Sequence, residues 1–198
     1  MTATVDPHLV VPEYLSRFLN WLFAEIKKAF LKESCEEGIV LWSSLPFLAK
    51  FLGDGVLFLW DTANMGGAEI CNVVTSLWEI CDSYVQEFYP IARKTVVQPP
   101  KILRCGISRG AVFSVGNGED YVGPCINIAA RLQKLSSLTF CFSRRGFDIE
   151  KHMPEETAGK YALKCVPLRG IGEDELVWVR KEEFDGLQDN EKALFRSP

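Results

Sequence analysis

Residues 119–131 read Glu119-Asp120-Tyr121-Val122-Gly123-Pro124-Cys125-Ile126-Asn127-Ile128-Ala129-Ala130-Arg131. The stretch predicts a strand that carries the carboxylate of Asp120, a tight turn at Gly123, and a helix that begins after the turn. Asn127 and Arg131 then stand four residues apart, so their amide and guanidinium groups project from one helix face. Such an array suits a nucleoside triphosphate, because the two groups can reach a sugar and a phosphate together.

The composition is that of an ordinary globular chain of 198 residues, 47% of them hydrophobic, which is long enough for one domain with a sizeable core. The net charge of −4 gives no basic surplus, so neither nucleic acid nor an anionic membrane is a predicted partner. The seven cysteines form no CxxC pair, and their odd number fits free thiols in the cytoplasm. No apolar run of about 18 residues and no leader-like N-terminus are seen, so we expect no transmembrane helix and no signal peptide.

Hydrophobic periodicity predicts the first elements of the chain. Apolar residues recur at helical spacing over residues 12–31, which indicates an amphipathic helix. Residues 45–60 are almost continuously apolar and are interrupted at 54–55 by Asp-Gly, which predicts two buried strands that meet at a hairpin turn. A second helix is expected over about residues 68–88, with its end near Pro90.

The rest of the chain is expected to alternate strands with one short helix. The predicted elements are a strand over 101–115, a helix over 126–135, a strand over 138–142, and a final strand pair at 161–166 and 176–179. This order predicts an α+β protein with a largely antiparallel, ferredoxin-like sheet that is flanked by helices. We expect a single domain over residues 1–181 and a polar, solvated tail over residues 182–198.

A second motif precedes the first along the chain. The segment Lys50-Phe51-Leu52-Gly53-Asp54-Gly55 is predicted to place Lys50 and Asp54 on one face of one strand, with glycines that let a phosphate or another backbone come close. Taken alone, the segment also suits a plain hairpin, in which Asp54 belongs to the turn and Lys50 keeps an edge strand soluble.

Together, the two motifs resemble those of the class III adenylate and guanylate cyclases. That family has a lysine followed after two residues by Gly-Asp and, further along, Asp-x-x-Gly-x-x-x-Asn-x-x-x-Arg. The matching residues here are Lys50, Asp54, Asp120, Gly123, Asn127 and Arg131. Residues 103–110 look like the family's strand before the second motif, and residues 168–173 look like its closing hairpin. The resemblance covers roughly residues 12–181 and implies the class III cyclase fold.

The resemblance also implies a reaction, in which the ribose 3′ oxygen attacks the α-phosphorus of a nucleoside triphosphate and pyrophosphate leaves. Asp54 matches an aspartate that binds Mg²⁺ or Mn²⁺, which are hard ions suited to carboxylates. Asn127 matches the residue that orients the ribose, and Arg131 the one that stabilises charge on the α-phosphate. Arg169 matches a basic residue on the terminal phosphates, although an exposed strand arginine would look the same.

Lys50 and Asp120 match the pair that reads the base. Lysine only donates and an ionised aspartate only accepts, so the pair suits the edges of adenine and cytosine. Guanine shows the reverse polarity. Uracil is also reversed, but in a shifted pose its O4 reaches Lys50 and its N3 donates to Asp120. In this family the metal carboxylates of one subunit face the base-reading and Asn/Arg residues of the other, which implies a homodimer with shared sites.

The resemblance gives three functional expectations. A bare catalytic domain is similar to the stand-alone pyrimidine cyclases of bacterial Pycsar anti-phage systems, which make cyclic CMP or cyclic UMP for a separate effector protein. The first alternative is an adenylate cyclase that makes cyclic AMP from ATP. The second is an inactive cyclase-homology module that only binds nucleotide. Retention of the whole set argues against the module, because binding alone does not require an arginine that acts in the transition state. The set is Lys50, Asp54, Asp120, Asn127 and Arg131.

The sequence departs from the family at its start. The family opens with a strand that ends in Phe-x-Asp-Ile-Val-Gly-Phe-Thr and supplies the other metal aspartate. Here residues 2–6, Thr-Ala-Thr-Val-Asp, form at most a shortened strand that ends at Asp6. Asp6 is the candidate second metal ligand, although Asp6-Pro7 also suits a simple lead-in. The start of the domain could instead lie upstream, or Asp61 could take the role.

Overall fold

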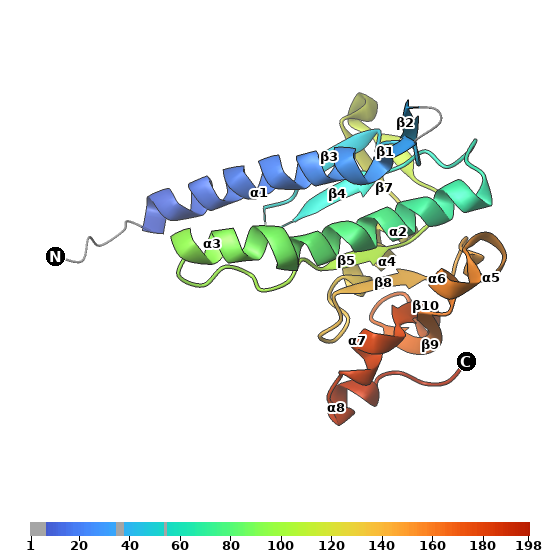
Figure 1. The fold of residues 1–198 in the computed structure, drawn as a ribbon. Coiled ribbons are helices and arrows are strands. Elements are labelled where there is room, and N and C mark those ends of the chain that lie inside the picture. The colour runs from blue at the N-terminus through green and yellow to red at the C-terminus, as the bar shows by residue number, and fades with distance from the viewer. Residues whose placement is uncertain (1–6, 35–37, 54) are drawn as a thin grey trace. The chain divides into compact units, whose positions relative to one another are not determined.

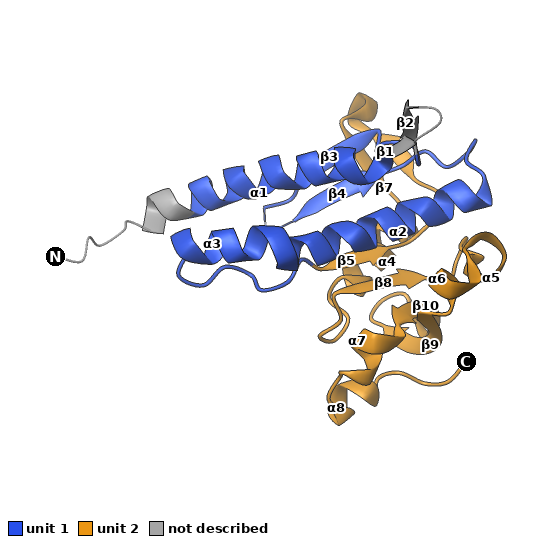
Figure 2. Ribbon diagram, viewed as in Figure 1, with its two compact units in different colours: residues 1–103 blue, residues 104–198 orange. Residues whose placement is uncertain are grey.

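A computed structural model describes residues 7–34, 38–53 and 55–198, and it shows an α+β protein (Figure 1). The chain divides into two compact units, residues 1–103 and residues 104–198 (Figure 2). The first unit is built on long helices and two hairpins. The second contains the largest sheet and the 119–131 segment.

The first unit is organised by helix α1 (Pro7–Phe30), which confirms the predicted helix but begins five residues before the predicted start at Pro12, so that Pro12 lies inside the helix. Its apolar stripe, with Phe18, Leu22 and Ile26 all buried, packs against helix α2 (Gly67–Ser83). Apolar residues at three- and four-residue steps lie on one helix face, so two such helices bury their stripes against each other. Figure 1 shows the two helices running side by side.

The expectation that the second helix ends near Pro90 was wrong. The chain continues from α2 through a π-helical turn, η1 (Tyr84–Phe88), into helix α3 (Tyr89–Thr95). Pro90 is the second residue of α3, directly after the wider π-turn, which accommodates a residue that has no amide donor. The amide of Tyr89 donates to the carbonyl of Tyr84, five residues back, which is the wider spacing of a π-turn.

Two hairpins complete the first unit. Strand β1 (Leu31–Ser34) pairs antiparallel with β2 (Gly38–Leu41), and β3 (Leu48–Phe51) pairs antiparallel with β4 (Val56–Leu59). The hairpin predicted at 45–60 is therefore confirmed. Its strands are not buried throughout, however, because Phe51 on β3 is 44% exposed. The ring of Phe58 packs on that of Phe23 on α1, with 6.0 Å between the ring centroids. A two-stranded sheet that is packed on one side leaves its other face open to solvent.

The second unit is built on a four-stranded sheet of order β5-β8-β10-β9. Its strands are β5 (Cys105–Ile107), β8 (Phe140–Ser143), β10 (Gly172–Arg180) and β9 (Tyr161–Leu168). The β5–β8 pairing is parallel and the other two are antiparallel, which confirms the strand predicted at 138–142 and the final strand pair. The strand expected over 101–115 is divided between β5 and a separate hairpin. Strands β6 (Phe113–Val115) and β7 (Asp120–Val122) form that hairpin around the short helical turn η2 (Gly116–Gly118).

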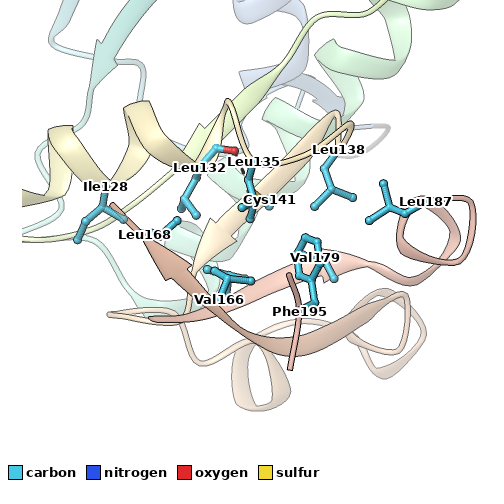
Figure 3. Close-up of a cluster of buried hydrophobic side chains, with 11 residues drawn as sticks. Ile128, Leu132, Leu135, Leu138, Cys141, Val166, Leu168, Val179, Leu187 and Phe195 are labelled. Carbon is cyan, nitrogen blue, oxygen red and sulfur yellow. Dashed lines mark hydrogen bonds between the residues drawn. The ribbon is translucent and has the colours of Figure 1, made fainter. Parts of the chain in front are cut away.

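Helix α4 (Pro124–Leu132) packs on β5 and β8, close to the span predicted at 126–135. Two short helices, α5 (Ile149–His152) and α6 (Glu155–Ala158), precede β9. One apolar cluster joins α4, the sheet and the C-terminal residues (Figure 3). Its buried members are Ile128, Leu132, Leu135, Leu138, Cys141, Val166, Leu168, Val177, Val179, Leu187 and Phe195.

The expectation of a solvated tail after Glu182 requires correction. The chain folds there into helices α7 (Lys181–Asp185) and α8 (Asp189–Lys192). Leu187 and Phe195 are buried in the apolar cluster. Burial of these two side chains is enough to anchor the otherwise polar segment to the core. Within the described ranges, the chain contains no helix that is both long enough and apolar enough to span a bilayer.

Candidate functional site

Helix α4 presents Asn127 and Arg131 on its outer face. Both side chains are exposed, whereas Cys125, Ile128 and Leu132 on the inner face are buried. The helix begins at Pro124, directly after Gly123, as predicted. A spacing of four residues places the two polar groups one turn apart on the same side. An amide and a forked cation are thus displayed together on a helix whose other side is fixed in the core.

Gly123 is required by close packing. Its backbone is extended, with φ 177° and ψ 151°, which any residue can adopt. A Cβ atom at this position would, however, lie 2.4 Å from the carbonyl oxygen of Ala111 and 3.2 Å from the Cα of Val112. The strand-to-helix junction therefore passes too close to the segment before β6 for any side chain to fit.

Two further glycines let β5 and the segment after it approach α4. A Cβ at Gly106 would lie 2.3 Å from the carbonyl oxygen of Ala129 and 2.4 Å from the amide nitrogen of Gln133. A Cβ at Gly110 would lie 3.2 Å from the Cβ of Cys125. The helix that carries Asn127 and Arg131 is thus seated directly on the backbone of its neighbour, which fixes its height above the sheet.

Asp120 begins strand β7, directly opposite Val115 on β6. Its carboxylate is exposed, and its Oδ1 accepts a hydrogen bond from the amide of Tyr121 at 2.9 Å. Directly paired residues of an antiparallel hairpin point to the same face, and the side-chain period along each strand is two. Asp120 therefore shares a face with Val115, Phe113 and Val122, which are 41%, 63% and 52% exposed.

The sequence interpretation missed this apolar face. The signal was present in Phe113-Ser114-Val115, where two apolar residues flank a polar one with period two. A carboxylate beside exposed apolar side chains combines a hydrogen-bond acceptor with a surface on which a flat aromatic ligand can lie.

Arg169 lies in the turn between β9 and β10, is exposed, and precedes Gly170, whose φ of 76° favours glycine. The turn is anchored on both sides. Leu168 belongs to the apolar cluster that contains Ile128 (Figure 3). Ile171 packs against the same cluster. The amide of Ile171 also donates to the carbonyl of Leu168 at 2.9 Å. The second unit thus holds Asp120, α4 and the Arg169 turn on a common framework.

The other predicted residues belong to the first unit. Lys50 lies on β3 and is partly buried, and its pairing with Asp120 around a base stays a prediction. Strand β3 ends at Phe51. Asp6 and Asp54, the predicted metal ligands, lie outside the described residues. Asp61 is exposed, and its Oδ1 accepts from the amide of Ala63 at 3.0 Å.

The described residues alone therefore do not form a metal site. Across residues 7–34, 38–53 and 55–198, no three His, Cys, Asp or Glu side chains are grouped so that they could hold an ion. The binding of Mg²⁺ or Mn²⁺ stays a prediction that depends on Asp6 and Asp54.

Comparison with known protein families gave no match. Comparison with curated proteins gave none either.

Replacement of Gly123 by alanine should loosen the contact with the segment before β6. Overpacking of this kind costs about 1–3 kcal/mol. Cys125 reports on the contact, because its Sγ lies 3.6 Å from the carbonyl oxygen of Ala111 and burial raises the pKa of its thiol. Since the thiolate is the reactive form, iodoacetamide should modify Cys125 slowly at pH 8 in the wild type and about tenfold faster in Gly123→Ala.

The rate is measured by peptide mass spectrometry, which separates Cys125 from the other cysteines. Gly172→Ala is the matched control, because the nearest atom to its Cβ, Oε1 of Glu175, would be at an ordinary 3.9 Å. Equal Cys125 rates in the two variants would contradict the steric account of Gly123.

Proposed function

We propose that this protein is a nucleotide cyclase of the class III type, which converts a nucleoside triphosphate to a 3′,5′-cyclic nucleotide and pyrophosphate. The observation that carries the proposal is the exposed pair Asn127 and Arg131, one helical turn apart on α4, directly after the strand that bears Asp120. This is the spacing of the family motif on a strand, turn and helix. The buried inner face of α4 holds the pair in place, as an active site requires.

In this proposal the phosphates meet two arginines. The guanidinium of Arg131 donates to the non-bridging oxygens of the α-phosphate, where charge develops as the 3′ oxygen attacks. Asn127 holds the ribose so that its 3′ oxygen faces the phosphorus, and Arg169 binds the terminal phosphates of the leaving pyrophosphate. Asp54 and Asp6 are the residues that would hold Mg²⁺ or Mn²⁺, which when bound lowers the charge on the attacking and leaving oxygens.

For the base, we propose that Asp120 accepts a hydrogen bond and Lys50 donates one. The apolar side chains of Phe113, Val115 and Val122 share the face of Asp120 and supply a surface for the ring. The preferred substrate in this proposal is a pyrimidine triphosphate, with cyclic CMP or cyclic UMP as an anti-phage signal in a bacterial cytoplasm. ATP satisfies the same pair of groups and is the alternative substrate.

The proposed assembly is a homodimer of the ferredoxin-like cyclase fold with sites shared between subunits. Lys50 and Asp54 lie in one compact unit of the chain, and Asn127, Arg131 and Arg169 lie in the other. That division is compatible with a site to which each subunit contributes a different unit. A separate effector protein would then read the cyclic product.

Product formation tests the chemistry. Purified protein is incubated with Mn²⁺ and each of the four ribonucleoside triphosphates separately, and the products are identified by mass spectrometry. We expect a cyclic nucleotide from CTP or UTP, and a fall in kcat of about 100-fold or more in Arg131→Ala, because one donor to a developing charge has an effect of that order. Lys151→Ala, which removes an exposed cation from α5, should keep the wild-type rate.

The result that opposes the proposal is the absence of any cyclic product with all four triphosphates. If nucleotide still bound under those conditions, the protein would be a nucleotide-binding module. A product from ATP alone would keep the chemistry and change the substrate.

Sharing of sites is tested by complementation. Asp54→Ala and Asn127→Ala proteins should each be inactive. Their mixture should recover activity, because half of the sites in a mixed dimer contain neither substitution. Statistical exchange gives about a quarter of the wild-type rate, since half of the dimers are mixed and each has one intact site. A mixture as inactive as its components, after subunit exchange is verified by mass spectrometry of labelled chains, argues for sites within single subunits.

A further inference from the structure

The C-terminal residues reach back to the loop that follows α4. Glu183 on α7 is partly buried, and its Oε2 accepts hydrogen bonds from the amides of Thr139 at 3.1 Å and Phe140 at 3.2 Å. These amides stand where the loop becomes strand β8. A carboxylate that accepts two backbone amides binds the loop by charge-assisted hydrogen bonds, which are stronger than neutral ones.

A second carboxylate holds the middle of the same loop. Oε1 of Glu191 on α8 accepts from the hydroxyls of Ser136 at 2.7 Å and Ser137 at 2.5 Å. These hydrogen bonds lower the pKa of Glu191, so the carboxylate is ionised at neutral pH. Ser136 has φ 54°, in the left-handed region that non-glycine residues seldom occupy, so surrounding contacts must hold it there. Arg104 supplies another contact, donating to the carbonyl of Ser136 at 3.1 Å.

Apolar packing follows the same route. Leu187, between α7 and α8, and Phe195, after α8, belong to the buried cluster that also contains Leu135 and Leu138 of the loop. Figure 3 shows Leu138 and Leu187 in the same part of this cluster. The end of the chain is fixed by residue 196, whose backbone exchanges hydrogen bonds of 2.9 and 2.8 Å with Cys165 on β9.

The loop is continuous with the part of α4 that carries Arg131. The amide of Gln133 donates to the carbonyl of Ala129 at 3.0 Å, and that of Lys134 donates to the carbonyl of Arg131 at 3.1 Å. Any displacement of residues 133–139 therefore acts on the last turn of α4. This turn has no further helical residues beyond it to support it, because α4 ends at Leu132.

We propose that residues 181–196 form a C-terminal clamp, in which Glu183 and Glu191 are positioning residues that fix the 133–139 loop and, through it, Arg131. The clamp itself is a property of the fold. Its effect on catalysis rests on the proposed cyclase function. Loss of either carboxylate leaves Arg131 itself unchanged but should allow the last turn of α4 to open, which would move the guanidinium. Small displacements of a charge-stabilising group reduce the reaction rate strongly.

The test compares Glu191→Ala with Glu182→Ala, which removes an exposed carboxylate from α7. Hydrogen exchange with mass spectrometry is recorded at a temperature where both variants are fully folded. Amides of residues 133–139 and of the last turn of α4 should exchange about tenfold faster in Glu191→Ala, as the loss of a charged hydrogen-bond acceptor predicts. Amides of β10 should keep their rates. With the triphosphate that the wild type cyclises, kcat should fall about tenfold while KM changes less than twofold.

Two further variants approach the same contact from other directions. Ser136→Ala/Ser137→Ala removes the donors and should reproduce the exchange pattern of Glu191→Ala. Glu191→Gln keeps an oxygen acceptor and should restore most of the protection and of the rate. If Glu191→Ala fails to fold, the comparison of Ser136→Ala/Ser137→Ala with Glu191→Gln decides whether the clamp exists.

Equal exchange in Glu191→Ala and Glu182→Ala would overturn the clamp. Faster exchange with an unchanged kcat would overturn the positioning role and keep only a structural one. If the wild type forms no cyclic product, the proposed function fails, whereas the exchange measurement still decides whether the clamp exists.

Discussion

The contact on which the candidate site depends is the seating of α4 on the bare backbone of β5 at Gly106. A side chain there would require the helix to move, because the Cβ would lie 2.3 Å from a helix carbonyl. Gly123 makes a comparable approach at the other end, where the chain enters the helix. Since α4 carries Asn127 and Arg131, these two glycines set the position of both polar groups relative to the sheet. Close packing at the two glycines therefore positions the groups that would carry out the proposed chemistry, while the side chains of Asn127 and Arg131 themselves face solvent.

The second unit combines two kinds of support for that helix. From inside, Ile128 and Leu132 join an apolar cluster that extends to the last residues of the chain. From outside, two carboxylates accept hydrogen bonds from the loop after the helix. Apolar burial contributes stability with little directionality, whereas charge-assisted hydrogen bonds fix orientation. A group that must meet a phosphate within a fraction of an ångström benefits from both.

Sequence reasoning predicted the parts of the fold that local patterns determine. The α1 stripe, the 45–60 hairpin, the start of α4 after Gly123 and the final strand pair all follow from periodicity and turn chemistry. The errors arose where tertiary context overrides local preference. Pro90 does not end its helix because a π-turn accommodates it, and Leu187 and Phe195 are buried because a nearby core receives them.

The candidate site could be predicted only as a spacing. The motif correctly placed Asn127 and Arg131 on one exposed helix face, because that depends on helix geometry alone. It gave no indication of the apolar residues beside Asp120, which depend on the register of the β6–β7 pair. Local sequence patterns could not predict the hydrogen bonds of Glu183 and Glu191 to the loop either, since these contacts join residues more than 40 positions apart. The pairing of Lys50 with Asp120 spans the two units and stays a prediction.

A crystal structure with Mn²⁺ and an α,β-methylene analogue of the triphosphate that binds best would show directly whether Arg131 meets the α-phosphate. We expect the guanidinium of Arg131 within hydrogen-bond distance of the α-phosphonate oxygens, the amide of Asn127 beside the ribose, and the base against the face of Asp120. A nucleotide bound away from α4, or one whose α-phosphonate lies out of reach of Arg131, would contradict this expectation.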